Sequence, residues 1–278
     1  MRNATPVVRR ARHAPAAAPR SDQAEGLRQL FAHERVRFVP VASNPHIACG
    51  GVMLERLCTA FAEHGVSTLV VDAAERAADS GAMAMVDLSQ CVERLSSDVS
   101  YLSARGLPIR FVDAFGSTRG FLQRAAESAP SCNVVLVHAR ASELARLFAP
   151  ARDVAAHGDG DGTCPIILAD DHPASVTHAY ASMKLLAQRV GVVVFDLLLG
   201  AAAQSPRADR IADRIAACAD DFLGAALREW ARVDPLGDAT DAPDDALRRL
   251  VGCRFAGAVG GRFLHPSALA AHALYATP

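Results

Sequence analysis

Short apolar runs alternate with longer amphipathic stretches from residue 36 onward, and this alternation constrains the fold more than any other feature. The runs are apolar at nearly every position, which is typical of strands buried on both faces of a parallel sheet. The stretches between them have helical periodicity, so the order predicts βαβ units. The predicted strands are residues 36–42, 67–72, 109–113, 133–138, 165–169 and 192–197.

Helices are predicted where apolar residues recur three or four positions apart. Together the elements predict an α/β fold, a mainly parallel sheet with helices on both faces. The Gly- and Asp-rich segments 153–163 and 236–245 indicate surface loops. We expect Phe222, Leu223 and Trp230 to make core contacts. The predicted helices are residues 51–64, 86–104, 118–128, 141–149, 173–190, 206–229, 244–251 and 266–275.

Composition excludes several classes of protein. With 51% apolar residues the chain is too hydrophobic to be disordered, and 29 basic against 30 acidic residues argue against a nucleic-acid partner. No apolar run approaches the roughly 18 residues of a membrane span, and the N-terminus lacks a signal-peptide core, so we expect a cytoplasmic protein. The seven cysteines form no C-x-x-C pair, which favours reduced thiols over disulfides or structural zinc.

The first 34 residues differ from the rest. Residues 1–20 contain five arginines, no acid and several prolines, which predicts a flexible basic arm. Residues 21–34 predict a short amphipathic helix, with Asp22 as the cap and Glu25 three positions later as in a capping box. Packing of this helix on its own domain explains the pattern as well as a partner does. Its apolar stripe is Ala24, Leu27, Leu30 and Phe31.

The turn between the first long strand and its helix is where a phosphate-binding loop is expected. Such a loop needs glycines for close backbone approach, a lysine for the phosphates and a Ser or Thr for Mg²⁺. Residues 43–52 (SNPHIACGGV) supply Gly50 and Gly51 but no lysine or threonine, and they have no G-x-G-x-x-G spacing. Lys184 is the only lysine in the chain, so it alone is available to any lysine-dependent mechanism.

Three stretches carry a family resemblance. Residues 22–28 (DQAEGLR) match a D-Q-A-x-x-L-R element, and residues 173–184 (PASVTHAYASMK) are similar to P-x-S-[IV]-T-D-A-Y-A-x-[MI]-K, with His178 in place of Asp. Residues 244–251 (DDALRRLV) are similar to D-x-x-L-R-R-A-V. From about residue 21 onward the chain thus resembles the FlhG/FleN group of MinD/ParA-like ATPases, regulators of flagellar number. The resemblance implies a P-loop NTPase architecture over residues 35–278.

The same resemblance shows departures in the nucleotide loop. The family's first turn is S-G-K-G-G-V-G-K-T-T, and an ungapped match places Pro45 and Gly50 at its two lysines. Gly51 and Val52 then stand at its threonines. The lysine contacts and the Mg²⁺ hydroxyl that support phosphoryl transfer are therefore missing.

The acidic positions depart as well. The family's D-x-D becomes Asp72-Ala73-Ala74, and its next acidic strand end becomes His138. The resemblance therefore implies a pseudo-ATPase with no metal site and with neither ATP nor Mg²⁺ as a cofactor. The vestiges of the nucleotide site are Gly50, Gly51 and Asp72.

The element at residues 22–28 is expected to act on a partner. The resemblance implies stimulation of an FlhF-type GTPase, and one well-placed glutamine or arginine can accelerate a slow GTPase in trans. Gln23 would orient the attacking water and Asp22 would cap the helix. Ala24 and Leu27 would belong to the docking stripe, and Arg28 would pair with an acidic surface.

The sequence favours a non-enzymatic regulator of flagellar number or placement, with FlhF as partner and with a flagellar transcriptional activator or basal-body proteins as further partners. The partner would recruit it to the cell pole or membrane. An alternative is an ATP-binding MinD-like switch that dimerises on nucleotide and controls flagellar assembly or transcription. A third hypothesis places a docking surface on the helix at 173–190.

Other candidate groups have weaker patterns. Asp170, Asp171 and His172 are consistent with a metal or acid–base cluster, or simply with a polar turn before Pro173. His138 and Cys164 lie at the ends of predicted strands, which is consistent with a Cys/His pair that lacks a third member. The last helix stands where MinD-like proteins bind membranes, but residues 266–274 contain no Lys or Arg, which argues against membrane attachment.

Overall fold

The computed structural model describes residues 36–78, 87–114, 117–149, 164–238 and 241–255. The chain divides into two units, residues 1–35 and residues 36–278, and the first unit lies outside the described residues. The predicted helix at 21–34, with Asp22, Gln23, Ala24, Leu27 and Arg28, therefore stays a prediction. The predicted helix at 266–275 lies outside the described residues too.

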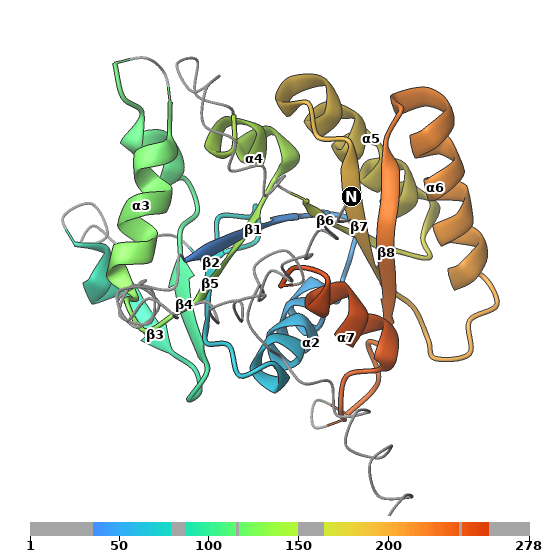
Figure 1. Ribbon diagram of the computed structural model, residues 1–278, viewed down its shortest axis with the longest axis horizontal. Coiled ribbons are helices and arrows are strands. Elements are labelled where there is room, and N and C mark those ends of the chain that lie inside the picture. The colour runs from blue at the N-terminus through green and yellow to red at the C-terminus, as the bar shows by residue number, and fades with distance from the viewer. Residues whose placement is uncertain (1–35, 79–86, 115–116, 150–163, 239–240, 256–278) are drawn as a thin grey trace, which may run out of the picture. The chain divides into compact units, whose positions relative to one another are not determined.

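Eight strands of the second unit form one sheet in the order β3-β4-β2-β5-β1-β6-β7-β8 (Figure 1). Every neighbouring pair is parallel except β3 with β4. The predicted α/β class with a mainly parallel sheet is therefore confirmed. The strands are β1 (Arg37–Ala42), β2 (Thr68–Asp72), β3 (Val92–Arg94), β4 (Val99–Ser103), β5 (Val134–Ala139), β6 (Ile166–Asp170), β7 (Val194–Gly200) and β8 (Ala226–Val233).

Helices cover both faces of this sheet. Apolar residues of α2 and α7 pack on one face, and those of α3, α4, α5 and α6 pack on the other (Figure 1). No helix among the described residues is long and apolar enough to cross a membrane. The helices are α2 (Gly50–Glu63), α3 (Arg119–Ser128), α4 (Ala141–Leu147), α5 (Pro173–Val190), α6 (Ala208–Leu223) and α7 (Asp245–Gly252), with short 3₁₀ turns η2 (Leu88–Cys91) and η3 (Pro108–Phe111).

Burial on both faces explains why the central strands are apolar at nearly every position. All six residues of β5 are buried. Because side chains alternate along a strand, Val135 and Val137 enter the core with α3 to α6, whereas Val134 and Leu136 enter the core with α2 and α7. The strand therefore has no solvent-facing side that needs polar residues.

The helix predicted at 86–104 is wrong. This segment forms η2 and the antiparallel pair β3–β4 instead. The turn between the strands explains the difference, because the Ser96 hydroxyl accepts hydrogen bonds from the amides of Asp98 (3.2 Å) and Val99 (3.1 Å). Such local side-chain bonds compete with a helix and favour a turn.

Two further predictions need correction. Residues 109–113 were expected to be a strand, but Pro108 begins η3 and Phe111 packs on Phe121 with ring centroids 5.4 Å apart. The helix predicted at 206–229 ends at Leu223, because Gly224 adopts a left-handed conformation (φ +57°) that favours glycine and is common after helices. Residues 226–233 form β8.

The expected core contacts of Leu223 and Trp230 are confirmed, since both pack against the core although each is only partly buried. Phe222 is 74% exposed, so the expectation that it also makes core contacts is wrong. In the solvent-facing part of α6 its ring has no core to enter.

A buried ion cluster connects β7, β8 and Arg254, the second residue after α7. The Asp196 carboxylate is fully buried and accepts hydrogen bonds from Arg228 Nε (3.1 Å) and Nη2 (2.6 Å), and from Arg254 Nη2. Arg254 also donates to the Cys164 carbonyl oxygen at 2.8 Å. A buried carboxylate with this many hydrogen-bond donors has its charge and its acceptor atoms compensated. Removing one partner would leave another charge buried without its counter-charge.

Removing the carboxylate should therefore destabilise the fold. We expect Asp196→Ala to lower the free energy of unfolding by about 3–5 kcal/mol, because it leaves the Arg254 guanidinium buried without its counter-charge. Asp213→Ala, an exposed position in α6, should change it by less than about 0.5 kcal/mol. Denaturant unfolding of both variants measures the difference. Equal losses of unfolding free energy in the two variants would contradict the stabilising role of the Asp196 carboxylate.

Candidate functional site

The carboxyl ends of β1, β2 and β5 lie side by side. Ala42 is paired with Ala139, and Asp72 with His138. Residues 43–49, which we call the β1–α2 turn, start at this edge, where the Ser43 amide donates to the Ala139 carbonyl oxygen at 2.9 Å. Ligands of open α/β sheets bind at the carboxyl ends of strands, so this edge is the candidate site.

Asn44 fixes one side of the β1–α2 turn. Its buried Nδ2 group lies 3.0 Å from each of three acceptors, the carbonyl oxygens of Leu168 and Ser175 and the Ser175 hydroxyl. Its Oδ1 atom accepts from the His46 amide at 3.1 Å, and its carbonyl oxygen accepts from the Ile47 amide at 3.2 Å. These bonds connect the turn to the end of β6 and the start of α5.

Arg76 holds the other side of the same turn. Its Nη2 donates to the Pro45 carbonyl oxygen at 2.7 Å, and its Nη1 donates to the Ile47 carbonyl oxygen at 2.9 Å. Two carbonyl oxygens of the turn therefore point at a cation. A phosphate-binding loop has the opposite polarity, because there the backbone N–H groups point at an anion.

The structure places Gly50 and Gly51 in the first turn of α2. A Cβ atom at either position would meet nothing within 4 Å, so packing does not require glycine there. The preceding residue, Cys49, makes no side-chain hydrogen bond that caps the helix. Both residues thus lie where a phosphate-binding helix terminus would be, and their role stays a prediction.

Asp72 and His138 form a hydrogen-bonded pair at the strand ends. Asp72 Oδ1 lies 2.9 Å from His138 Nδ1 and also accepts from the Ala74 amide at 3.1 Å. The Tyr101 hydroxyl donates to the second carboxylate oxygen at 3.1 Å. Both oxygens of the carboxylate that was predicted to be a vestige are therefore used inside the protein.

These contacts set the protonation of the cluster. Burial alone would raise the pKa of Asp72, but the His138 side chain, the Ala74 amide and the Tyr101 hydroxyl outweigh burial and lower that pKa. Burial and the adjacent Asp72 carboxylate raise the pKa of Tyr101 to about 12. At neutral pH the edge therefore contains a carboxylate and a neutral phenol.

A second histidine pair connects the turn to α5. The rings of His46 and His178 meet edge to face with centroids 5.6 Å apart. Burial lowers the pKa of His178, and the neighbouring His46 lowers it further, against the opposing charge of Glu75 and a backbone contact with Ser43. His178, which stands where the family has Asp, thus approaches the turn from the far side.

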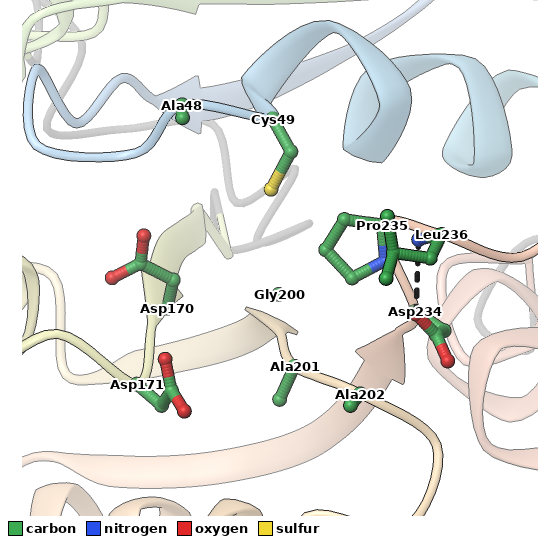
Figure 2. Close-up of a pocket in the computed structure, with 10 residues that line it drawn as sticks. All are labelled: Ala48, Cys49, Asp170, Asp171, Gly200, Ala201, Ala202, Asp234, Pro235 and Leu236. Carbon is green, nitrogen blue, oxygen red and sulfur yellow. Dashed lines mark hydrogen bonds between the residues drawn. The ribbon is translucent and has the colours of Figure 1, made fainter.

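A cavity of about 290 Å³ lies beyond the other end of the turn, where β6, β7 and β8 end (Figure 2). Its lining contains three carboxylates and the Cys49 thiol but no basic side chain. Asp234 already accepts bonds from the amides of Ala203 (2.8 Å) and Leu236 (2.9 Å). The lining residues are Ala48, Cys49, Asp170, Asp171, Gly200, Ala201, Ala202, Asp234, Pro235 and Leu236.

The structure favours the polar-turn interpretation of residues 170–172. Asp170 Oδ1 accepts from the His172 amide at 3.0 Å, and His172 Nδ1 accepts from the Ala174 amide at 3.3 Å as the cap of α5. Among the described residues no group of three or more His, Cys, Asp or Glu side chains is arranged to hold a metal ion.

The suggested pair of His138 and Cys164 does not form. β1 lies between the strand that carries His138 and the strand that follows Cys164. Two strand spacings, about 10 Å, therefore separate them, which is beyond hydrogen-bond reach. Burial raises the pKa of the Cys164 thiol to about 12, which also argues against a nucleophile.

Lys184 lies far from the β1–α2 turn. It is exposed on α5, eleven residues after the Pro173 that starts the helix. At 1.5 Å per residue this separation is about 16 Å along the helix axis. The single lysine of the chain is thus not placed to replace the missing lysine of a phosphate loop.

Comparisons with solved structures identify the fold. The MinC:MinD cell division complex of Aquifex aeolicus matches 82% of this chain and 98% of its own, with 13% identity and a TM-score of 0.50. A plasmid partition protein from Borrelia burgdorferi matches 81% and 100% of the two chains, with 7% identity and a TM-score of 0.50. The chain has the MinD-type P-loop NTPase fold. No protein-family model and no curated protein matches its sequence.

Within the MinD-type fold, three residues of the site were not predicted from sequence. Asn44 precedes a proline in a turn, where Asn side chains commonly form hydrogen bonds to the nearby backbone. Its role in the turn could therefore have been predicted from the local sequence. Arg76 and Tyr101 reach the site from segments distant in sequence. Only the sheet order brings them to this edge.

The low pKa of His178 predicts a pH effect on stability. Its pKa in the folded state is below the ordinary 6.5, so the unfolded state binds its proton more readily. The stability that the neutral ring contributes is present above about pH 6.5 and is lost as the pH falls through the lower folded value. We expect His178→Asn to lose less unfolding free energy than the wild type between about pH 7.5 and 5. Parallel pH curves in denaturant titrations would contradict this assignment.

Proposed function

We propose that this chain is a MinD-type regulator that does not hydrolyse nucleotide and that controls flagellar number or placement through an FlhF-type GTPase. The claim that the chain does not hydrolyse nucleotide rests on the polarity of the β1–α2 turn, whose Pro45 and Ile47 carbonyl oxygens accept hydrogen bonds from Arg76. The claim that it acts on an FlhF-type GTPase rests on the resemblance of residues 22–28 to the D-Q-A-x-x-L-R element.

Electrostatics supports the loss of nucleotide chemistry. Phosphate oxygens are acceptors, and so are the Pro45 and Ile47 carbonyl oxygens that the turn directs at Arg76, so these carbonyl groups would repel a phosphate in that place. The Asp72 carboxylate at the same edge adds a negative charge. The turn has no lysine, and the first residues of α2 (Gly50, Gly51 and Val52) have no hydroxyl for Mg²⁺, so the stabilisation on which phosphoryl transfer depends is missing.

The partner would then perform the chemistry. In this proposal Gln23 orients the attacking water in the GTPase, Asp22 caps the helix, and Ala24 and Leu27 pack on the partner while Arg28 pairs with an acidic group. These residues belong to the unit that precedes the sheet domain. The regulator needs no nucleotide of its own for this role.

GTP turnover by FlhF tests the proposal. We expect the full-length chain to increase the turnover and Gln23→Ala to abolish that increase, because a water-orienting glutamine contributes to the transition state. Gln29→Ala, a matched glutamine change outside residues 22–28, should keep the stimulation. Stimulation by wild type and Gln23→Ala alike would contradict the role of Gln23, and no stimulation by the wild type would contradict the proposed function.

The cavity at the ends of β6, β7 and β8 favours one alternative function. Its position is where open α/β sheets bind ligands, and the α2 N-terminus borders it through Ala48 and Cys49 (Figure 2). An ATP-binding switch that dimerises on nucleotide would use this space. Light scattering with and without Mg·ATP distinguishes the two: the proposed regulator keeps one mass, and the switch doubles its mass with nucleotide.

A further inference from the structure

The segment 72–76 at the end of β2 contacts the ends of two other strands, β1 and β5. Arg76 bonds to the β1–α2 turn, Asp72 pairs with His138 at the end of β5, and the Glu75 carboxylate lies 3.3 Å from the Arg140 Nε atom just beyond β5. Within the segment, the Ala74 amide donates a hydrogen bond to the Asp72 carboxylate. Residues 72–76 thus connect the β1–α2 turn to the end of β5 and to the residue that follows β5.

We infer that residues 72–76 form a clasp that holds the β1–α2 turn in one conformation, with Arg76 as the residue that closes it. The inference goes beyond the proposed function, because it concerns what sets the conformation of the turn rather than what the chain acts on.

The chemistry of Arg76 suits this task. Its planar guanidinium donates in two directions, so it spans the carbonyl oxygens of Pro45 and Ile47, which are two residues apart. A lysine ammonium is a compact charge on a flexible stem and lacks this rigid fork. Arg76 is therefore not interchangeable with lysine here.

The turn is held on its opposite side as well. Asn44 fixes it to the end of β6 and to Ser175, and the Ile47 side chain is buried between these anchors at 3% exposure. Opening the turn would break the Arg76 bonds and expose Ile47 to water. With Arg76 removed, Asn44 and the burial of Ile47 remain, so the fold should persist while the turn opens more often.

Hydrogen exchange of two turn amides tests the clasp. The His46 amide is bonded to Asn44 Oδ1 and the Ile47 amide to the Asn44 carbonyl oxygen, so both report on opening of the turn. We expect Arg76→Ala to exchange both amides about tenfold faster or more than the wild type, because two net hydrogen bonds are lost. Arg76→Lys should behave nearly like Arg76→Ala. Arg110→Ala, an exposed arginine on η3, should match the wild type.

Two results would overturn the inference. One is unchanged exchange of His46 and Ile47 in Arg76→Ala. The other is an equal acceleration of the buried β5 amides, because the change would then act on the whole fold rather than on the turn. Turnover by FlhF reports on the proposed function and turn exchange on the clasp, so the failure of one is distinguishable from the failure of the other.

Discussion

The hydrogen bonds from Arg76 to the Pro45 and Ile47 carbonyl oxygens hold the turn at the carboxyl edge of this sheet. In a P-loop NTPase the equivalent turn presents N–H groups to phosphate, and the surrounding residues neutralise its charge. Here a side chain of the protein supplies the cation, and the backbone supplies acceptors. The fold and the position of the turn are retained, while two of the turn's carbonyl oxygens bind a guanidinium.

The neighbouring polar groups are consistent with that reversal. Asp72 uses both carboxylate oxygens on His138, Ala74 and Tyr101, and Asn44 uses both ends of its amide on the backbone and on Ser175. Groups that are satisfied within the protein gain little from an added ligand. These polar groups at the edge are therefore bonded within the protein, which supports the proposal that the chain acts without a nucleotide of its own.

The sequence predicted the sheet class and most central elements because their residues are buried on both faces or on one regular stripe, as in β5 and α5. It failed where short-range chemistry competes with periodicity, as at the Ser96 turn, at Pro108 and at Gly224. Within the site, the missing lysine and the position of Gly50 and Gly51 were readable from spacing. The role of Arg76 was not, because it depends on a contact across 29 residues or more that only the sheet order creates.

A crystal structure from crystals grown with millimolar Mg·ATP would show whether the β1–α2 turn binds nucleotide. We expect the Pro45 and Ile47 carbonyl oxygens to stay bonded to Arg76, and no phosphate to lie at the start of α2. A triphosphate held by the amides of residues 48–52, with Arg76 displaced from the turn, is the opposite result and would refute the proposed loss of nucleotide binding.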